Sequence, residues 1–192
     1  MVEVRIHGRG GQGVVTASDL LAMAAFENGY SAQAFPSFGS ERMGAPVVSY
    51  CRIRNTEIRT REPVLEPDLV IVQDPTLLNI MDVFSGLKPD GYALVNSTKT
   101  LDELELRDLA DKYKPGHIQV IPATEIAFQY VGRNVPNAVL LGAVTAFSKI
   151  VTMEAVEKAI RNKFPPAIAE KNIAAANAAA DLLKNEEVGA NA

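Results

Sequence analysis

The sequence predicts an α/β fold with three layers: a mostly parallel sheet with helices on both faces, an antiparallel hairpin excursion and a helical C-terminal region. Two observations support this prediction. Segments with the two-residue period of a strand, or with a short continuous apolar run, alternate with helical segments as far as Ile121. From Ala123 onward the apolar residues keep helical spacing almost to the end of the chain. Right-handed connections between alternating strands and helices give a mostly parallel sheet.

The first strand runs from Val2 to His7, where apolar and polar residues alternate. A glycine-rich turn follows, Gly8-Arg9-Gly10-Gly11-Gln12-Gly13. After Gly13 the apolar residues recur at steps of three and four, which indicates a helix that ends near Asn28-Gly29. The glycines therefore lie where a strand ends and a helix begins.

The other elements follow from the same two periodicities. Expected strands cover residues 30–35, 47–54, 67–74, 91–96 and 117–121, and expected helices cover residues 75–84, 101–113, 123–131, 138–150, 153–164 and 168–184. We expect strand 47–54 to turn at Asn55-Thr56 and to pair antiparallel with residues 57–59. Asn137 and Thr152 are candidate N-caps. Residues 1–192 are taken as a single domain, in which 186–192 form a frayed tail.

Composition excludes several classes of protein. The chain has 192 residues, of which 47% are hydrophobic and 22% charged, as in an ordinary globular domain. A formal net charge of −4 argues against nucleic-acid binding. No apolar run approaches the ~20 residues of a membrane span, and no signal-peptide pattern follows Met1. We therefore expect a cytoplasmic protein that binds neither nucleic acid nor membrane.

Few residues have the chemistry of a catalytic or metal-binding group. Cys51 is the single cysteine, so the chain cannot form an internal disulfide, or a zinc site or iron–sulfur cluster built from its own thiols. Its alternating context predicts a small buried hydrophobe rather than a nucleophile. His7 ends the first strand and could contact a ligand, but neither it nor His117 has the partners of a hydrolase triad.

The glycine turn predicts a seat for phosphate. The start of a helix leaves backbone N–H groups unpaired and carries partial positive charge, and a turn without Cβ atoms lets an anion approach closely. The spacing Gly8-x-Gly10-x-x-Gly13 also matches the dinucleotide fingerprint, but residues 31–36 lack the acidic residue that should hold the ribose. Val14 and Val15 replace the Lys and Ser or Thr of a P-loop. The alternative is a tight turn that only packs helix on strand.

The loop from Phe35 to Pro46 is the second informative stretch. It contains a proline bend, several small residues and the charged pair Glu41-Arg42. Arg42 could bind a phosphate or carboxylate through its planar guanidinium group, oriented by Glu41. An exposed ion pair on a connecting loop is an equally good interpretation.

Together these stretches carry a resemblance. Residues 9–13 (RGGQG) and 37–46 (SFGSERMGAP) resemble the gamma subunit of the 2-oxoacid:ferredoxin oxidoreductases, most closely that of pyruvate:ferredoxin oxidoreductase (pyruvate synthase). The similarity spans nearly the whole chain. It includes the strand that starts at Pro67-Asp68 and ends at Asp74, the strand that ends at Asn96-Ser97, and residues 136–143 (PNAVLLGA).

The resemblance implies a function for the complex. The family interconverts pyruvate and coenzyme A (CoA) with acetyl-CoA and CO2 while ferredoxin is reduced or oxidised. It implies alpha, beta and delta subunits as partners, which would hold thiamine diphosphate, magnesium and the iron–sulfur clusters, and ferredoxin as a partner through the complex. CoA then remains as the ligand for this chain, which would help to close the active site without a catalytic residue of its own.

We expect CoA to be bound by residues of the two stretches. The candidate binding residues are Arg9, Gly10, Gly11, Gln12, Gly13, Ser37, Phe38, Gly39, Glu41 and Arg42. Backbone donors of residues 10–13 would bind the phosphates, Arg9 or Arg42 would add charge, and the loop 37–44 would face a partner subunit.

Other interpretations remain open at this stage. The chain could be the gamma subunit of a related enzyme, for example one acting on 2-oxoisovalerate. It could be a stand-alone oxidoreductase that binds a nucleotide such as NAD, as the glycine spacing alone suggests. It could also be a scaffold subunit whose glycine turn binds nothing.

Overall fold

The structure, a computed structural model, describes residues 1–37 and 43–190, with side chains as far as residue 185. In these residues the core is a six-stranded sheet with the order β2-β3-β1-β4-β5-β6. The strands are β1 (Val2–Arg9), β2 (Ser31–Pro36), β3 (Pro46–Arg54), β4 (Leu69–Val72), β5 (Tyr92–Asn96) and β6 (Ile118–Ile121). Strands β1, β4, β5 and β6 pair in parallel, which confirms the predicted α/β fold.

The antiparallel part of the sheet differs from the prediction. β3 runs antiparallel to both of its neighbours, with Cys51 opposite Val4 of β1 and opposite Ala34 of β2. Both edges of β3 are therefore occupied, so residues 57–59 cannot pair with it and form no strand. The predicted pairing of residues 47–54 with residues 57–59 was wrong. The predicted antiparallel hairpin is formed by β2 and β3 instead, and β3 also pairs with β1.

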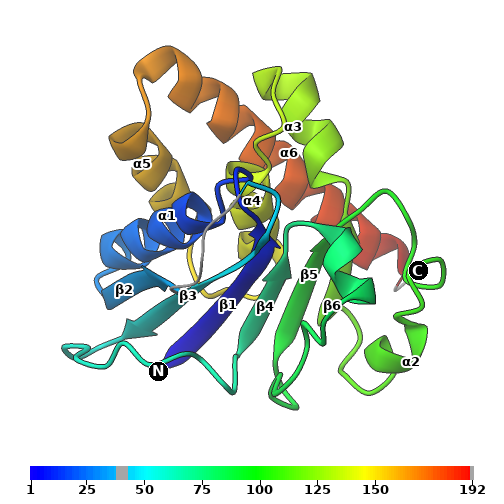
Figure 1. The fold of residues 1–192 in the computed structure, drawn as a ribbon. Coiled ribbons are helices and arrows are strands. Elements are labelled where there is room, and N and C mark those ends of the chain that lie inside the picture. The colour runs from blue at the N-terminus through cyan, green and yellow to red at the C-terminus, as the bar shows by residue number, and fades with distance from the viewer. Residues whose placement is uncertain (38–42, 191–192) are drawn as a thin grey trace.

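In the described part of the chain, α-helices cover one face of the sheet (Figure 1). They are α1 (Val14–Glu27), α3 (Ala123–Val131), α4 (Asn137–Phe147), α5 (Met153–Lys163) and α6 (Pro166–Ala190). Their apolar sides pack on alternate strand residues, such as Ile6 and Ile71, which are fully or almost fully buried. α6 continues to Ala190, so residues 186–190, which we expected as a frayed tail, are helical. Residues 191–192 lie outside the described part of the chain.

Short helices and turns cover the opposite face of the sheet. Val70 and Val72 point to this side and pack against the 3-10 helix η1 (Pro75–Asn79), the short helix α2 (Arg107–Ala110) and the turns around them. The longer helices predicted for residues 75–84 and 101–113 were therefore wrong beyond these short pieces. Leu101, Leu104 and the other apolar residues of the second segment still reach the core, because successive turns place them there without a continuous helix.

The two predicted N-caps had different outcomes. Thr152 caps α5, since its hydroxyl accepts the N–H of Ala155 at 3.2 Å. Asn137 does not cap α4; it lies inside the first turn, and its side chain binds Gln73 instead. Cys51 is fully buried, as expected, and burial raises the pKa of its thiol. Its thiol is therefore protonated and unreactive at neutral pH.

The tightest helix contact joins α4 to α6. A Cβ atom on Gly142 would overlap the backbone of Ala176, so the two helices approach closely only because this position has no side chain. The alanine-rich sequence of α6 supports the same contact, with Ala175, Ala176 and Ala179 completely buried.

We expect Gly142→Ala to destabilise the protein by about 1–3 kcal/mol, the usual range for overpacking a core. The same change in an exposed helix would stabilise it by up to about 1 kcal/mol. Chemical denaturation of the purified chain measures the difference. The control is Ala174→Leu on the exposed side of α6, which should change the free energy of unfolding by less than about 0.5 kcal/mol. A stabilised Gly142→Ala variant would contradict the predicted contact.

Candidate functional site

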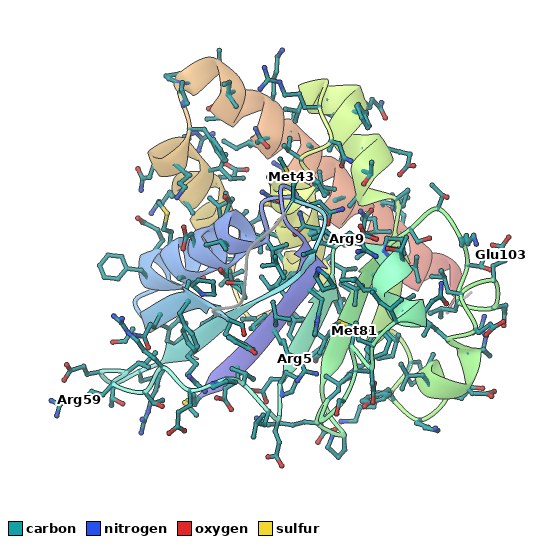
Figure 2. The ribbon with its side chains drawn as sticks, viewed as in Figure 1. Arg5, Arg9, Met43, Arg59, Met81 and Glu103 are labelled. Atoms are coloured by element: carbon teal, nitrogen blue, oxygen red, sulfur yellow. The ribbon has the colours of Figure 1, made fainter. Side chains whose placement is uncertain are left out.

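Three loops meet at the carboxyl ends of the central strands. They are the glycine loop (residues 8–13) after β1, the segment Gln73-Asp74 after β4, and Asn96 at the end of β5. The strand order changes direction between β1 and β4, which is where ligands bind in open α/β sheets. Arg9 and Met43 also lie at this end of β1 (Figure 2).

The glycine loop is fixed partly by backbone hydrogen bonds. Gly10 donates to the carbonyl of Ala45 at 2.9 Å and accepts from the N–H of Gly44 at 3.0 Å. The N–H of Gln12 donates to the carbonyl of Arg9 at 3.1 Å. These N–H groups are engaged within the protein. Among the described residues, the N–H groups of Gly11 and Gly13 and those at the start of α1 remain as donors for an anion.

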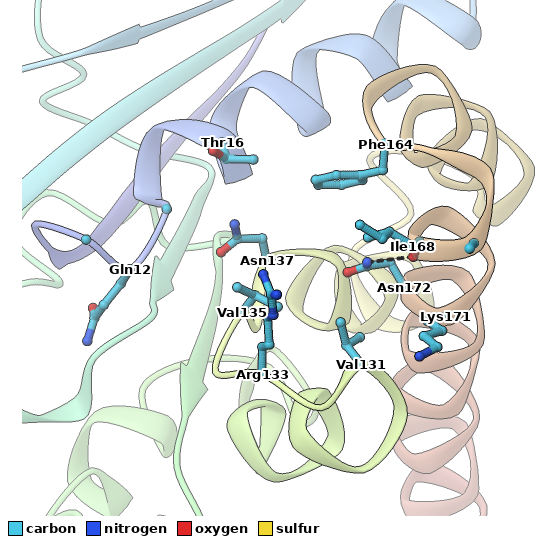
Figure 3. Close-up of a pocket in the computed structure, with 13 residues that line it drawn as sticks. Gln12, Thr16, Val131, Arg133, Val135, Asn137, Phe164, Ile168, Lys171 and Asn172 are labelled. Carbon is cyan, nitrogen blue, oxygen red and sulfur yellow. Dashed lines mark hydrogen bonds between the residues drawn. The ribbon is translucent and has the colours of Figure 1, made fainter.

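The side chain of Gln12 stabilises the glycine loop through two hydrogen bonds. Its Oε1 accepts the N–H of Arg9 at 2.8 Å, and its Nε2 donates to Oδ2 of Asp74 at 2.7 Å. Figure 3 shows the side chain turned away from the pocket that the backbone of the loop lines. The side chain of Gln12 therefore joins the ends of β1 and β4, whereas the backbone of Gln12 lines the pocket.

The charge of Arg9 is compensated within the protein. Its guanidinium group donates to the Thr76 hydroxyl and to the carbonyl of Gly44, and its Nε lies 3.3 Å from Oδ2 of Asp74. Burial alone would raise the pKa of Asp74, but hydrogen bonds from Thr76 and Gln12 and the charge of Arg9 lower it. Asp74 is therefore ionised at neutral pH, and the Arg9–Asp74 pair is close to neutral as a unit.

Helix α1 begins with unpaired donors. Gly13 precedes it in the left-handed conformation, with φ of 74°, and no side chain of the described residues caps the helix. Within the described residues, Ala17 is the first whose N–H finds a helical acceptor, the carbonyl of Gly13 at 3.0 Å. The N–H groups of Val14, Val15 and Thr16 have no such partner. This is the arrangement that binds anions at helix starts.

A pocket of about 480 Å3 opens at this helix start. Figure 3 shows it between the beginning of α1, the connection from α3 to α4, and the first turns of α6. We call it the α1 pocket. It is lined by Gly11, Gln12, Gly13, Thr16, Val131, Arg133, Val135, Asn137, Phe164, Ala167, Ile168, Lys171 and Asn172.

The lining of the α1 pocket combines cations with an apolar wall. Arg133 and Lys171 form no ion pair with any carboxylate in the part of the chain that the structure describes. Val131, Phe164 and Ile168 supply the apolar side. Two cations and a free helix start around a partly apolar cavity suit a phosphorylated organic molecule.

The predicted binding residues divide into several groups. Gly11, Gln12 and Gly13 line the α1 pocket. Arg9 and Gly10 line only a neighbouring cavity beside Met43, which Gly11 and Gly13 also line. Ser37 donates its N–H to the carbonyl of Val48 at the end of β2. Phe38, Gly39, Glu41 and Arg42 lie outside the described residues. His7, which we considered as a ligand contact, is buried beneath the sheet surface and reaches neither cavity.

Sequence reasoning missed three residues that the fold brings to the pocket. Arg133, Asn137 and Lys171 follow the glycine loop by well over a hundred positions, and no local pattern connects them with it. The sequence does contain one indication of Arg133: the helical periodicity breaks around it, and such a break predicts a loop between two helices, where ligands often bind. For Asn137 the sequence predicts only an N-cap.

Comparison with known proteins agrees with this architecture. The family model described as pyruvate ferredoxin/flavodoxin oxidoreductase matches residues 3–182. The chain belongs to this family. It is 46% identical to the common gamma subunit of the pyruvate and ketoisovalerate oxidoreductases of Thermococcus kodakarensis, over 93% of this chain and 95% of that protein.

Two further relatives extend the comparison. The chain is 44% identical to pyruvate synthase subunit PorC of Methanothermobacter marburgensis, covering 96% of this chain and 99% of that protein. The crystal structure of the pyruvate oxidoreductase subunit PORC of Thermotoga maritima superposes with a TM-score of 0.77 and 38% identity, over 94% and 95% of the two chains. The family is one of oxidoreductase subunits, which agrees with the resemblance inferred from the sequence.

The described residues lack both a membrane-spanning helix and a cluster of metal ligands. No helix in them is long and apolar enough to cross a membrane. Over the same residues, no group of three or more His, Cys, Asp or Glu side chains is placed to hold a metal ion.

His7 makes stability depend on pH. Its ring is 5% exposed, neither ring nitrogen has a partner among the described residues, and burial together with the nearby charge of Arg5 lowers its pKa to about 4. Below the unfolded pKa of about 6.5 the unfolded chain takes up a proton that the folded chain does not. Stability is therefore lost as the pH falls from about 6.5 to about 4, by about 3 kcal/mol in total.

His7→Gln should remove this part of the pH dependence, because glutamine does not titrate. Chemical denaturation at several pH values between 7 and 4 measures the slope, and His117→Gln is the matched control that should retain it. An unchanged slope in His7→Gln would assign the effect to another group.

Proposed function

We propose that the chain is the gamma subunit of a pyruvate:ferredoxin oxidoreductase and that its α1 pocket binds the phosphates of CoA. Membership of the family supports the first part. The second part is supported by one observation above all: the uncapped start of α1, Arg133 and Lys171 face the same cavity. All of these groups donate hydrogen bonds, as phosphate oxygens require.

The structure refines the expected role of the glycine loop. Gly10 and Gln12 use their N–H groups internally, so the backbone donors that line the α1 pocket are those of Gly11, Gly13 and Thr16. The N–H groups of Val14 and Val15 belong to residues that line the neighbouring cavity beside Met43. Arg9 is neutralised by Asp74, so the uncompensated charge on this side comes from Arg133 and Lys171. The apolar wall formed by Val131, Phe164 and Ile168 would accept the organic part of the ligand.

This subunit would bind and position CoA without covalent chemistry of its own. With one cysteine, buried and protonated, the chain has no thiolates for an iron–sulfur cluster. We therefore assign the clusters, thiamine diphosphate and magnesium to alpha, beta and delta subunits, through which ferredoxin would also be reached. Holding CoA at its phosphates would leave the thiol end free to reach the active site of a partner subunit.

A second substrate has specific support. The relative from Thermococcus kodakarensis is a common subunit of pyruvate and ketoisovalerate oxidoreductases. A chain that binds CoA but not the 2-oxoacid could serve both complexes, since CoA is common to the two reactions. We propose 2-oxoisovalerate as the alternative substrate of the complex.

Affinity purification of the chain from its native source tests the assignment. We expect larger subunits with brown iron–sulfur absorbance to co-purify, together with dye reduction that depends on a 2-oxoacid and CoA. Assays with pyruvate and with 2-oxoisovalerate identify the substrate. A chain that purifies alone and takes up NAD would overturn the assignment.

Substitutions in the pocket test CoA binding. Arg133→Ser and Lys171→Ser should each raise the KM for CoA about tenfold in the assembled complex, because a charge-assisted hydrogen bond contributes about 1.5–3 kcal/mol. The rate at saturating CoA should change little. Lys184→Ser is the matched control on α6, where the lysine pairs with Asp181 and lies outside the pocket lining. Unchanged kinetics in both pocket variants would favour a scaffold role.

A further inference from the structure

Asn137 is placed as a binding residue would be. It is 7% exposed, opens helix α4 and lines the α1 pocket. Its Oδ1 accepts from Nε2 of Gln73 at 2.7 Å. Its Nδ2 has no partner among residues 1–37 and 43–185, and Figure 3 shows it directed into the pocket towards the start of α1.

The orientation of this amide is set by a backbone carbonyl. Nε2 of Gln73 donates both to Oδ1 of Asn137 and to the carbonyl oxygen of Gln12, at 2.6 Å. A backbone carbonyl can only accept, so the amide of Gln73 cannot turn around without bringing its own oxygen against that of Gln12. The oxygen of Asn137 must then face Gln73. Its NH2 group must face the pocket.

This arrangement leaves a polar atom unsatisfied. Gln73 is 2% exposed, and its Oε1 is buried without a partner among the described residues. Buried oxygens without hydrogen bonds are rare in folded proteins because they lose their water without compensation. Gln73 therefore keeps this orientation although its buried, unpaired oxygen is unfavourable in free energy. The orientation directs Nδ2 of Asn137 into the pocket.

Gly13 provides the room that this donor needs. A Cβ atom at position 13 would lie 2.6 Å from Nδ2 of Asn137. The missing side chain lets the amide stand beside the free N–H groups of α1. An oxygen atom at this point would meet the backbone donors and Asn137 together.

We propose that Asn137 is a ligand-binding residue of the α1 pocket, which donates Nδ2–H to an anionic oxygen of the ligand, and that Gln73 is its positioning residue. The inference rests on the proposed function in taking CoA as that ligand and a phosphate oxygen as the acceptor. It adds that the pocket selects a hydrogen-bond acceptor at this point, since Asn137 can offer only a donor.

Asn137→Asp in the assembled complex is the direct test. One carboxylate oxygen would face the pocket and repel a phosphate, whereas an acid in the first turn of α4 is favourable for the helix. We expect the KM for CoA to rise about tenfold or more, with little change in the rate at saturating CoA. Inorganic pyrophosphate, as a competitor of CoA, should lose affinity in parallel.

Asn134→Asp is the matched control. Asn134 is exposed, lies three residues earlier in the same connection and does not line the pocket, so the variant adds the same charge without touching the ligand. It should leave the KM for CoA near that of the native complex. An equal rise in both variants would show a general charge effect and overturn the role of Asn137.

Gln73→Glu tests the positioning role. A carboxylate accepts only, and one of its oxygens would replace Nε2 and repel the carbonyl of Gln12 as well as Oδ1 of Asn137. Asn137 would then turn its NH2 group towards position 73 and its oxygen into the pocket. We expect a rise in the KM for CoA in the same direction as in Asn137→Asp, again with little effect on the rate at saturating CoA. A normal KM in Gln73→Glu would overturn the positioning role.

The outcomes separate this inference from the proposed function. If Asn137→Asp leaves the KM unchanged while Arg133→Ser raises it, CoA still binds in the pocket and the role of Asn137 is wrong. If neither variant changes the KM, the proposed CoA site itself is wrong. If Asn137→Asp does not assemble, Asn137→Ser, which removes the amide without adding charge, decides in its place: a raised KM supports the inference and a normal KM overturns it.

Discussion

The hydrogen bond from Nε2 of Gln73 to the carbonyl of Gln12 is the contact on which the arrangement of the site depends. It ties the end of β4 to the glycine loop that follows β1, and the same nitrogen reaches Asn137 at the start of α4. Asn96 extends the connection to β5, because its Nδ2 donates to the carbonyl of Gln73 at 2.9 Å. Asn96 also donates to the Thr124 hydroxyl and accepts the Thr124 N–H. Amide groups thus join three parallel strands to the starts of two helices, where no continuous secondary structure could do so.

Three glycines of the loop are required by close packing against other side chains. A Cβ atom on Gly11 would lie 2.5 Å from Sδ of Met43, and one on Gly13 would collide with Asn137. Both residues also have positive φ, where other residues are strained. Gly8 has a third reason, since a Cβ there would lie 2.5 Å from Cγ2 of Val14. Within the spacing that resembles the dinucleotide fingerprint, Gly13 is therefore required by a distant residue, Asn137, whereas Gly8 is required by the close packing of β1 on the start of α1. Gly11, which Met43 requires, lies outside that spacing.

Sequence reasoning succeeded where structure is local and failed where it is not. The periodicities gave β1, α1 and α3 nearly to the residue, because each buries one face against the same core. They failed at residues 101–113, since turns can bury the same apolar residues as a helix. The partners of β3 were missed because strand pairing joins residues that no local pattern relates. Of the candidate site, the glycine loop could be found from its own residues, whereas Arg133 and Lys171 reach it only through the packing of α3, α4 and α6.

Charge in this protein acts locally rather than through its sum. The chain carries a net charge of −4, and Arg9, the cation within the glycine loop, is paired with Asp74. The cations that face the α1 pocket come from distant segments and have no acidic partner in the described residues. Exposed charges are screened by salt, whereas a buried amide such as Asn137 is not. Attraction to the pocket should thus come mainly from Arg133 and Lys171 and weaken with ionic strength, while the discrimination between acceptor and donor groups should come from Asn137 and persist.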